Sequence, residues 1–248
     1  MSERIQQAQQ WFLTAEGSVL QAQEQHCIDS MLPMVFGYHL MQLSVCPDTP
    51  LYNSSKIRHR FSLAETAGSS IAALCAAEDL PIANESIDVA LLHHVLEFSE
   101  QPHRILQELA RVIMPSGYVV LVGFNPLSLL GLASFVGRWF NRGVGYQHAL
   151  RRSRLEDWLT LMGFTVQRIE QGYYLPPWPW LLRTRLGKAC NRWLGHRQWP
   201  LGGFYIVLAK KEVVRLTPLR PKLPHRGAGM IPLMEPLYTT KPSKKSER

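Results

Sequence analysis

The segment between residues 86 and 122 limits the possible folds more than any other feature of this sequence. Residues 86–92, Ser-Ile-Asp-Val-Ala-Leu-Leu, form an apolar run typical of a strand buried on both faces. Residues 101–113 place their apolar side chains on one helical face, and a Pro-Ser-Gly turn at 115–117 leads into a second apolar run at 118–122. Strand, helix and strand in this order predict an α/β domain with a parallel sheet.

The rest of the chain fits the same architecture. We expect a sheet whose first half is truncated, because the linkers at 46–56 and 65–70 are too short for the helical crossovers that normally join parallel strands. Apolar spacing predicts further strands at 36–45, 57–64, 70–75, 164–170 and 204–210, and helices at 3–32 (broken at 14–17), 127–140 and 154–162.

Composition divides the chain into three parts. Residues 1–35 are expected to be a helical N-terminal extension, and residues 36–211 the main α/β domain. Within that domain, residues 173–202 form an insertion rich in aromatic and basic side chains. Residues 212–248 are basic and rich in proline with little apolar periodicity, which predicts a flexible tail.

The charge is distributed unevenly along the chain. Residues 1–136 carry 6 basic and 13 acidic side chains, whereas residues 137–248 carry 21 and 6. This asymmetry favours an anionic partner for the second half, although a basic tail that only aids solubility is an alternative. The segment Trp180–Leu194 has the pattern of a basic amphipathic helix, which suits an anionic membrane surface or a lid over a lipid-like acceptor. A helix packed on the sheet with solvated arginines is the alternative, and nucleic acid is not an expected partner.

Several classes of protein are not expected. No stretch reaches the roughly 18 consecutive apolar residues of a transmembrane helix, and the N-terminus lacks the layout of a signal peptide. The four cysteines are widely scattered, so we expect no disulfide scaffold and a cytoplasmic location by default. We also expect no metal site, because the sequence contains no clustered His, Cys and Asp pattern.

Residues 77–122 resemble a known family. They contain Ala-Glu-Asp-Leu-Pro-Ile at 77–82, Ser-Ile-Asp-Val at 86–89 and His-Val-Leu-Glu at 94–97. This order is similar to that of class I S-adenosylmethionine-dependent methyltransferases of the type 11 group, which run A-E-x-L-P-F, S-F-D-x-V and H-x-L-E-H. The likeness is close over residues 77–122 and looser over 36–211. Segments 11–14, 36–38 and 123–126 also resemble a small proteobacterial branch of that group.

The resemblance implies a Rossmann-like methyltransferase sheet, S-adenosylmethionine as cofactor and methyl transfer to a small or lipophilic acceptor. Ligands of open parallel sheets bind beyond the carboxyl ends of the strands, where several polar clusters of this chain should converge. On the donor side the resemblance places Gly37, Glu65, Glu78, Asp79 and His94, and on the acceptor side His93, Glu97 and Asn125. It assigns no catalytic residue.

The sequence also departs from the family. The glycine-rich loop that follows the first strand is replaced by residues 42–50, which contain no glycine. Ala76 stands where an acidic residue often meets the adenine, and the final histidine of H-x-L-E-H is Phe98. These departures keep open a catalytically degenerate binding or regulatory protein. The polar clusters also have purely structural interpretations. Residues 78–79 and 125–126 could form turns, and residues 93–94 could be a histidine pair whose hydrogen bonds are satisfied at a strand end.

Overall fold

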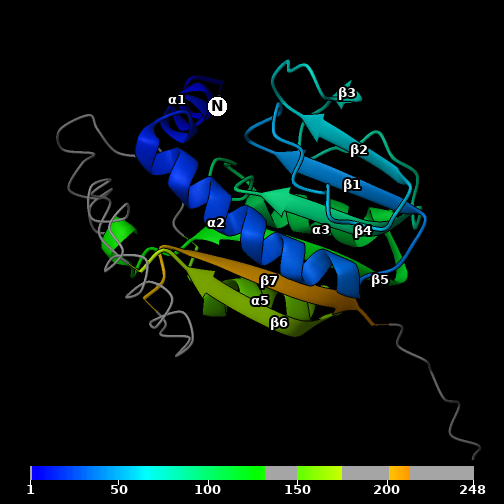
Figure 1. Ribbon diagram of the computed structural model, residues 1–248. Coiled ribbons are helices and arrows are strands. Elements are labelled where there is room, and N and C mark those ends of the chain that lie inside the picture. Colours follow the sequence, from blue (N-terminus) through cyan, green and yellow to red (C-terminus); the bar gives the residue numbers. More distant parts are fainter. Residues whose placement is uncertain (1, 132–149, 175–200, 213–248) are drawn as a thin grey trace, which may run out of the picture. The chain divides into compact units, whose positions relative to one another are not determined.

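The computed structural model describes residues 2–131, 150–174 and 201–212, and Figure 1 shows their arrangement. Seven strands form one sheet in the order β3-β2-β1-β4-β5-β7-β6. Strands β1 to β5 run parallel to one another, and β7 is antiparallel to both β5 and β6. The strands are β1 (His39–Ser44), β2 (His59–Ala64), β3 (Ala73–Leu74), β4 (Ile87–His93), β5 (Ile113–Phe124), β6 (Phe164–Gly172) and β7 (Phe204–Lys211).

The register of the central strands brings their carboxyl ends to one edge of the sheet. Ser44 at the end of β1 pairs with His93 at the end of β4. His93 in turn pairs with Val122 near the end of β5. Side chains that follow these strands are therefore neighbours at this edge, as the sequence predicted.

Helices cover both faces of the sheet (Figure 1). The N-terminal helices α1 (Ser2–Phe12) and α2 (Ala15–Met31), followed by the short η1 (Leu32–Met34), pack on one face. Helices α3 (Pro102–Val112) and α5 (Arg152–Leu161) pack on the other. The predicted break between the first two helices is confirmed, since the hydroxyl of Thr14 accepts the backbone N–H of Gly17 and caps α2.

The truncated first half of the fold is confirmed. No helix occurs in residues 45–58 between β1 and β2, or in residues 65–72 between β2 and β3. The face that crossover helices would otherwise cover is packed instead by α1 and α2. Because successive strand residues point to opposite faces, Leu40 and Val89 contact the N-terminal helices while Met41 and Ala90 face α3 and α5.

Two boundaries differ from expectation. Strand β5 begins at Ile113, five residues before the predicted start, because α3 ends at Val112 and the chain passes directly into the strand. Strand β3 has only two residues. Of the predicted helix 127–140, residues 132–140 lie outside the described part of the chain, as do most of the insertion 173–202 and of the tail 212–248.

Residues 1–213 form one compact unit, in which the N-terminal helices pack on the sheet. Among the described residues, none of the helices combines the length and apolar character needed to cross a membrane.

Candidate functional site

A pocket opens at the carboxyl edge of the sheet, above the ends of β1 and β2. Its volume is about 20 Å³, room for about one water molecule, so a larger ligand would have to open it further. The lining is mostly apolar, and one of its residues comes from the N-terminal helix α1. The lining residues are Ile5, Leu43, Ser44, Val45, Ala64, Glu65, Thr66, Ala77, Val95 and Phe98.

Glu65 is the one charged residue of this lining. It follows the last residue of β2, and its Oε1 accepts the backbone N–H of Ala77 at 3.3 Å. Burial raises the pKa of Glu65, and the nearby charge of Glu78 adds to this, against the opposing effect of the Ala77 hydrogen bond. The pocket therefore presents one partly buried carboxylate among apolar walls.

The loop after β1 is held by the N-terminal extension. The side-chain amide of Gln9 on α1 donates to the carbonyl oxygen of Val45 at 2.8 Å and to Oγ1 of Thr66 at 2.9 Å. Gln9 also lines a second and larger pocket, with a volume of about 200 Å³. It is lined by Gln9, Phe12, Leu13, Gln21, Cys46, Pro47, Asp48, Thr49 and Ala67.

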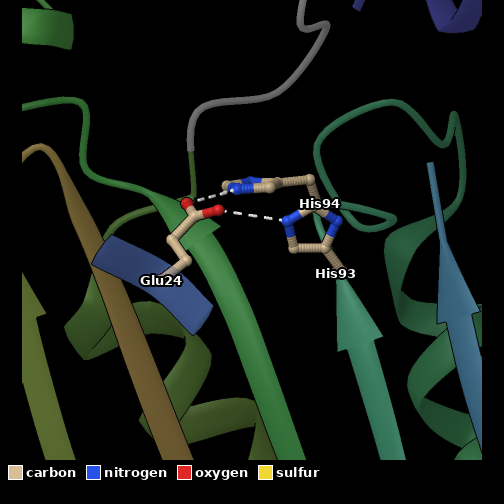
Figure 2. Close-up of side chains that lie close together, drawn as sticks. All are labelled: Glu24, His93 and His94. Carbon is tan, nitrogen blue, oxygen red and sulfur yellow. Dashed lines mark hydrogen bonds and ion pairs between the residues drawn. The ribbon is translucent and has the colours of Figure 1, made fainter. Parts of the chain in front are cut away.

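Glu24 on α2 reaches the end of β4 and meets two histidines there (Figure 2). The Nε2 of His93 lies 3.1 Å from Oε2 of Glu24, and the Nε2 of His94 lies 2.8 Å from Oε1. All three side chains are fully buried. One carboxylate thus accepts from two imidazoles that follow each other in the sequence.

The electrostatics of this cluster are strongly coupled. Burial by itself would raise the pKa of Glu24, but the charge of His94 and the hydrogen bonds from both histidines outweigh it, so the pKa is lowered. Burial lowers the pKa of His93. Burial also opposes the charged form of His94, yet Glu24 and Glu97 raise its pKa to about 9. The metal-free cluster therefore holds an ionised Glu24, a neutral His93 and a protonated His94.

The outer ring nitrogens face further polar groups. Nδ1 of His93 lies 3.0 Å from the hydroxyl of Ser44, and Nδ1 of His94 lies 3.6 Å from Oε1 of Glu97. That Glu97 oxygen also accepts the backbone N–H of Phe124 at 2.7 Å. The ring of Phe124 stacks on His94 with centroids 3.9 Å apart.

The backbone at His94 allows both imidazoles to reach one carboxylate. Its φ of 57° lies in the left-handed region, which costs a non-glycine residue about 1–2 kcal/mol. The ring of Phe12 on α1 packs over the pair, with its centroid 5.4 Å from each imidazole. The N-terminal extension therefore supplies both the carboxylate and an apolar cover for the histidines.

The predicted site residues do not all gather in one place. Of the eight, only Glu65 lines the pocket above β1 and β2. His93, His94 and Glu97 lie together, but their partners are Glu24, Ser44 and Phe124.

The other acidic and amide residues have local partners. Glu78 accepts the hydroxyl of Ser99, and exposed Asp79 lies in a turn closed by its N–H to the carbonyl of Ala76. Oδ1 of Asn125 accepts the N–H of Leu127, which forms the turn after β5. Donor-side and acceptor-side roles for these residues remain predictions.

The placement of Gly37 at the donor side is corrected by the structure. Gly37 precedes β1 and lies beside Asp88, at the amino edge of the sheet, opposite to the pocket. A Cβ at this position would lie 2.2 Å from Cβ of Asp88, so the glycine is required for close packing. A residue before a strand cannot reach the edge where that strand ends.

Glu24 was not among the predicted site residues, and no metal site was expected because the sequence has no clustered His, Cys and Asp pattern. One ligand atom from each of Glu24, His93 and His94 lies within 4.8 Å of the other two. A signal was present, because Glu24 falls on the buried stripe of α2 between Leu20 and Ile28. A carboxylate on an apolar stripe requires a buried partner.

Comparison with known proteins shows which proteins this chain resembles in sequence and in fold. Residues 51–121 match the family described as "Methyltransferase domain". The seven-stranded sheet has the Rossmann-like fold of solved S-adenosylmethionine-dependent methyltransferases.

Individual proteins are also similar to this chain. The chain is 27% identical over 183 residues to the uncharacterized protein YafS of Escherichia coli strain K12, an alignment that covers 74% of this chain and 72% of YafS. A possible histamine N-methyltransferase from Thermotoga maritima superposes with a TM-score of 0.54 at 19% identity, covering 82% of this chain and 93% of that one.

A third similar structure contains bound ligands. Geranyl diphosphate C-methyltransferase from Streptomyces coelicolor A3(2), in complex with Mg²⁺, geranyl diphosphate and S-adenosyl-L-homocysteine, superposes with a TM-score of 0.52 at 13% identity. The superposition covers 79% of this chain and 82% of that one. At these identities the solved structures establish the fold.

Proposed function

We propose that this protein is an S-adenosylmethionine-dependent methyltransferase that acts on a small or lipophilic acceptor. The observation that carries the proposal is the apolar pocket at the carboxyl edge of β1 and β2, with the Glu65 carboxylate at the tip of β2. Ligands of open parallel sheets bind at this edge. The pocket chemistry fits the donor, since S-adenosylmethionine combines a flat apolar ring, ribose hydroxyls and a cationic centre.

When bound, S-adenosylmethionine supplies an electrophilic methyl group on its sulfonium. Glu65 would accept hydrogen bonds from the ribose hydroxyls, as the family resemblance also implies. The side chains of Ile5, Val95 and Phe98 would pack around the apolar part of the donor and exclude water. Because methyl transfer from a sulfonium needs little proton transfer, most of the rate enhancement should come from holding donor and acceptor in line.

The second pocket supports the proposal of a binding site for the methyl acceptor. It lies beyond the Gln9 bridge from the donor pocket, and Phe12 and Leu13 give it an apolar wall. The amide Nε2 of Gln21 is buried at its side without a hydrogen-bond partner among the described residues. An apolar acceptor carrying one oxygen that faces Gln21 matches this lining. A lipid-like acceptor would also suit the basic segment Trp180–Leu194, which lies outside the described residues.

Isothermal titration with S-adenosylmethionine and S-adenosylhomocysteine tests donor binding. We expect one site per chain for each ligand and an affinity at least tenfold weaker in Glu65→Gln. A Glu156→Gln variant serves as the matched control, because Glu156 lies on α5, outside the pocket lining, and its carboxylate pairs with Arg152. Absence of heat at millimolar ligand in the folded wild-type protein would rule the donor out.

A binding or regulatory protein that keeps the methyltransferase fold is the second candidate. The loop after β1 favours this candidate. Val45 and Pro47 lie where the family has a glycine-rich loop, whose backbone approaches the donor closely without side chains in between. Gln9 also ties this loop to α1. Donor binding without release of S-adenosylhomocysteine, tested against a panel of small and lipophilic acceptors, would favour this candidate over the enzyme.

A further inference from the structure

We propose that Glu24, His93 and His94 form a binding site for a divalent first-row metal ion, with zinc as the best fit. Each residue offers one ligand atom, and these atoms lie within 4.8 Å of one another. Two ligands at 2.0–2.1 Å from a tetrahedral zinc are about 3.3 Å apart. Nε2 of His93 lies 3.1 Å from Oε2 and Nε2 of His94 lies 2.8 Å from Oε1 of Glu24, so each imidazole must move back from its oxygen by a few tenths of an ångström to admit an ion.

The donor set selects the kind of ion. Two imidazole nitrogens and one carboxylate oxygen bind zinc and iron(II) in proteins, whereas calcium and magnesium prefer oxygen ligands alone. The three side chains are fully buried, and each comes from a helix or a strand end rather than a mobile loop. A divalent cation there would neutralise the negative charge of the buried Glu24 carboxylate.

The surroundings of the histidines match those of metal ligands. Metal-bound imidazoles usually donate their other ring N–H to a carboxylate, hydroxyl or carbonyl, which fixes the ring. Metal binding would release the Nε2 proton of His94 to solvent and move the ring proton of neutral His93 from Nε2 to Nδ1. Nδ1–H of His93 would then face the Ser44 hydroxyl at 3.0 Å, and Nδ1–H of His94 would face Glu97 at 3.6 Å.

Two unsatisfied atoms provide independent support. Nδ1 of His94 and Oε2 of Glu97 are buried and have no hydrogen-bond partner among the described residues. A buried polar atom without a partner is costly, so such atoms call for an explanation. A small rotation of His94 toward an ion on its Nε2 side would let Nδ1–H donate to Glu97 and satisfy the imidazole.

An ion at this place would be structural. It would join α2 of the N-terminal extension to the end of β4, and it would fix α1 and α2 on the face that lacks crossover helices. This role is independent of the proposed methyl transfer, and metal content can be measured whether or not the protein binds the methyl donor.

The first experiment uses the full-length protein without substitutions. The protein is purified without chelators, its metals are quantified by mass spectrometry, and it is then stripped and titrated with Co²⁺. We expect one equivalent of zinc or iron after purification, one Co²⁺ per chain with visible d–d absorption, and displacement of Co²⁺ by Zn²⁺. No specific binding of Co²⁺ or Zn²⁺ at millimolar concentration would overturn the proposal.

Substitutions locate the ion. We expect Glu24→Cys to retain one Co²⁺ and to gain the near-ultraviolet charge-transfer band of a cobalt–thiolate bond, which a hydrogen-bonding role of Glu24 would not produce. Glu16→Cys, on the same helix, should not gain this band above the wild-type level. Glu97→Gln, which keeps the oxygen that accepts Phe124 N–H, should weaken binding by roughly 10–100-fold. A bound ion whose spectrum and affinity are unchanged in both Glu24→Cys and Glu97→Gln would disprove this site.

Discussion

Oε1 of Glu24 lies 2.8 Å from Nε2 of His94, although 70 positions separate the two residues in the chain. Both side chains are fully buried, so this contact anchors α2 to the end of β4 in the interior. The N-terminal extension is therefore an integral part of the domain core. Its polar anchor lies at the sheet edge where ligands of this fold bind.

Glu24→Gln should lower the free energy of unfolding of the metal-free protein by about 3 kcal/mol, a typical loss when one partner of a buried ion pair is removed. Urea denaturation in the presence of a chelator measures this effect. Glu16→Gln, near the start of the same helix and only partly buried, should cost less than about 1 kcal/mol. Equal stability of the two variants would contradict a buried anchor at Glu24.

Gly37→Ala should destabilise the fold by about 1–3 kcal/mol and leave donor affinity of the folded protein unchanged. The added Cβ would lie 2.2 Å from Cβ of Asp88. Movement of Asp88 would weaken its hydrogen bonds from the N–H groups of Tyr38 and His39, at 2.9 and 2.8 Å. Thermal unfolding and calorimetric titration separate the two effects, with Phe36→Ala at an exposed neighbour as control. A loss of donor affinity without a loss of stability would restore Gly37 to the donor site.

Donor affinity should fall as the pH is lowered through the raised pKa of Glu65, which lies above its ordinary value of 4.5. The ionised carboxylate accepts the hydrogen bonds of the ligand and attracts its positive charge, whereas the protonated form does neither as well. The folding stability of the free protein changes with pH in the opposite direction to donor affinity. Because folding raises the pKa of Glu65, this residue contributes stability at acid pH, and that stability is lost as the pH rises through the pKa of the folded state.

Calorimetric titration of wild type and Glu65→Gln between pH 5 and pH 8 measures this dependence. The Gln variant should bind more weakly and with little change over this range. An identical pH profile in both proteins would show that another group controls donor binding.

Gly123→Ala should cost about 1–3 kcal/mol of stability, because the new Cβ would lie 2.7 Å from Oε1 of Glu97 and 2.7 Å from the ring of Tyr205. The displaced Glu97 would also lose the N–H of Phe124. At Gly163, where φ is +81° and no heavy atom lies within 4 Å, alanine should cost only backbone strain of about 1 kcal/mol. Denaturant midpoints rank the two variants, and a smaller loss at Gly123 would contradict close packing there.

Part of the site could be predicted because it depends on strand order alone. Glu65 was assigned from the family resemblance as the acidic residue that closes the second strand, and it lies directly after β2, at the edge where ligands of this fold bind. Gly37 was misplaced because it was assigned from resemblance to a family segment, without regard to its position before β1. His93 and His94 were placed at the correct edge, but their direction could not be known, because it depends on the backbone conformation of His94 and on a helix far away in the sequence.

By itself, the sequence determined the order and type of the elements, since apolar periods of two and of 3.6 residues reflect local backbone geometry. It also determined that the first half of the sheet lacks crossover helices, because the linker lengths exclude them. Only the tertiary structure decided what replaces those helices and which buried groups meet. Packing of α2 on the open face brought Glu24 to His93 and His94. The sequence shows that a buried carboxylate needs polar partners, but the packing of the helix on the sheet decides which residues they are.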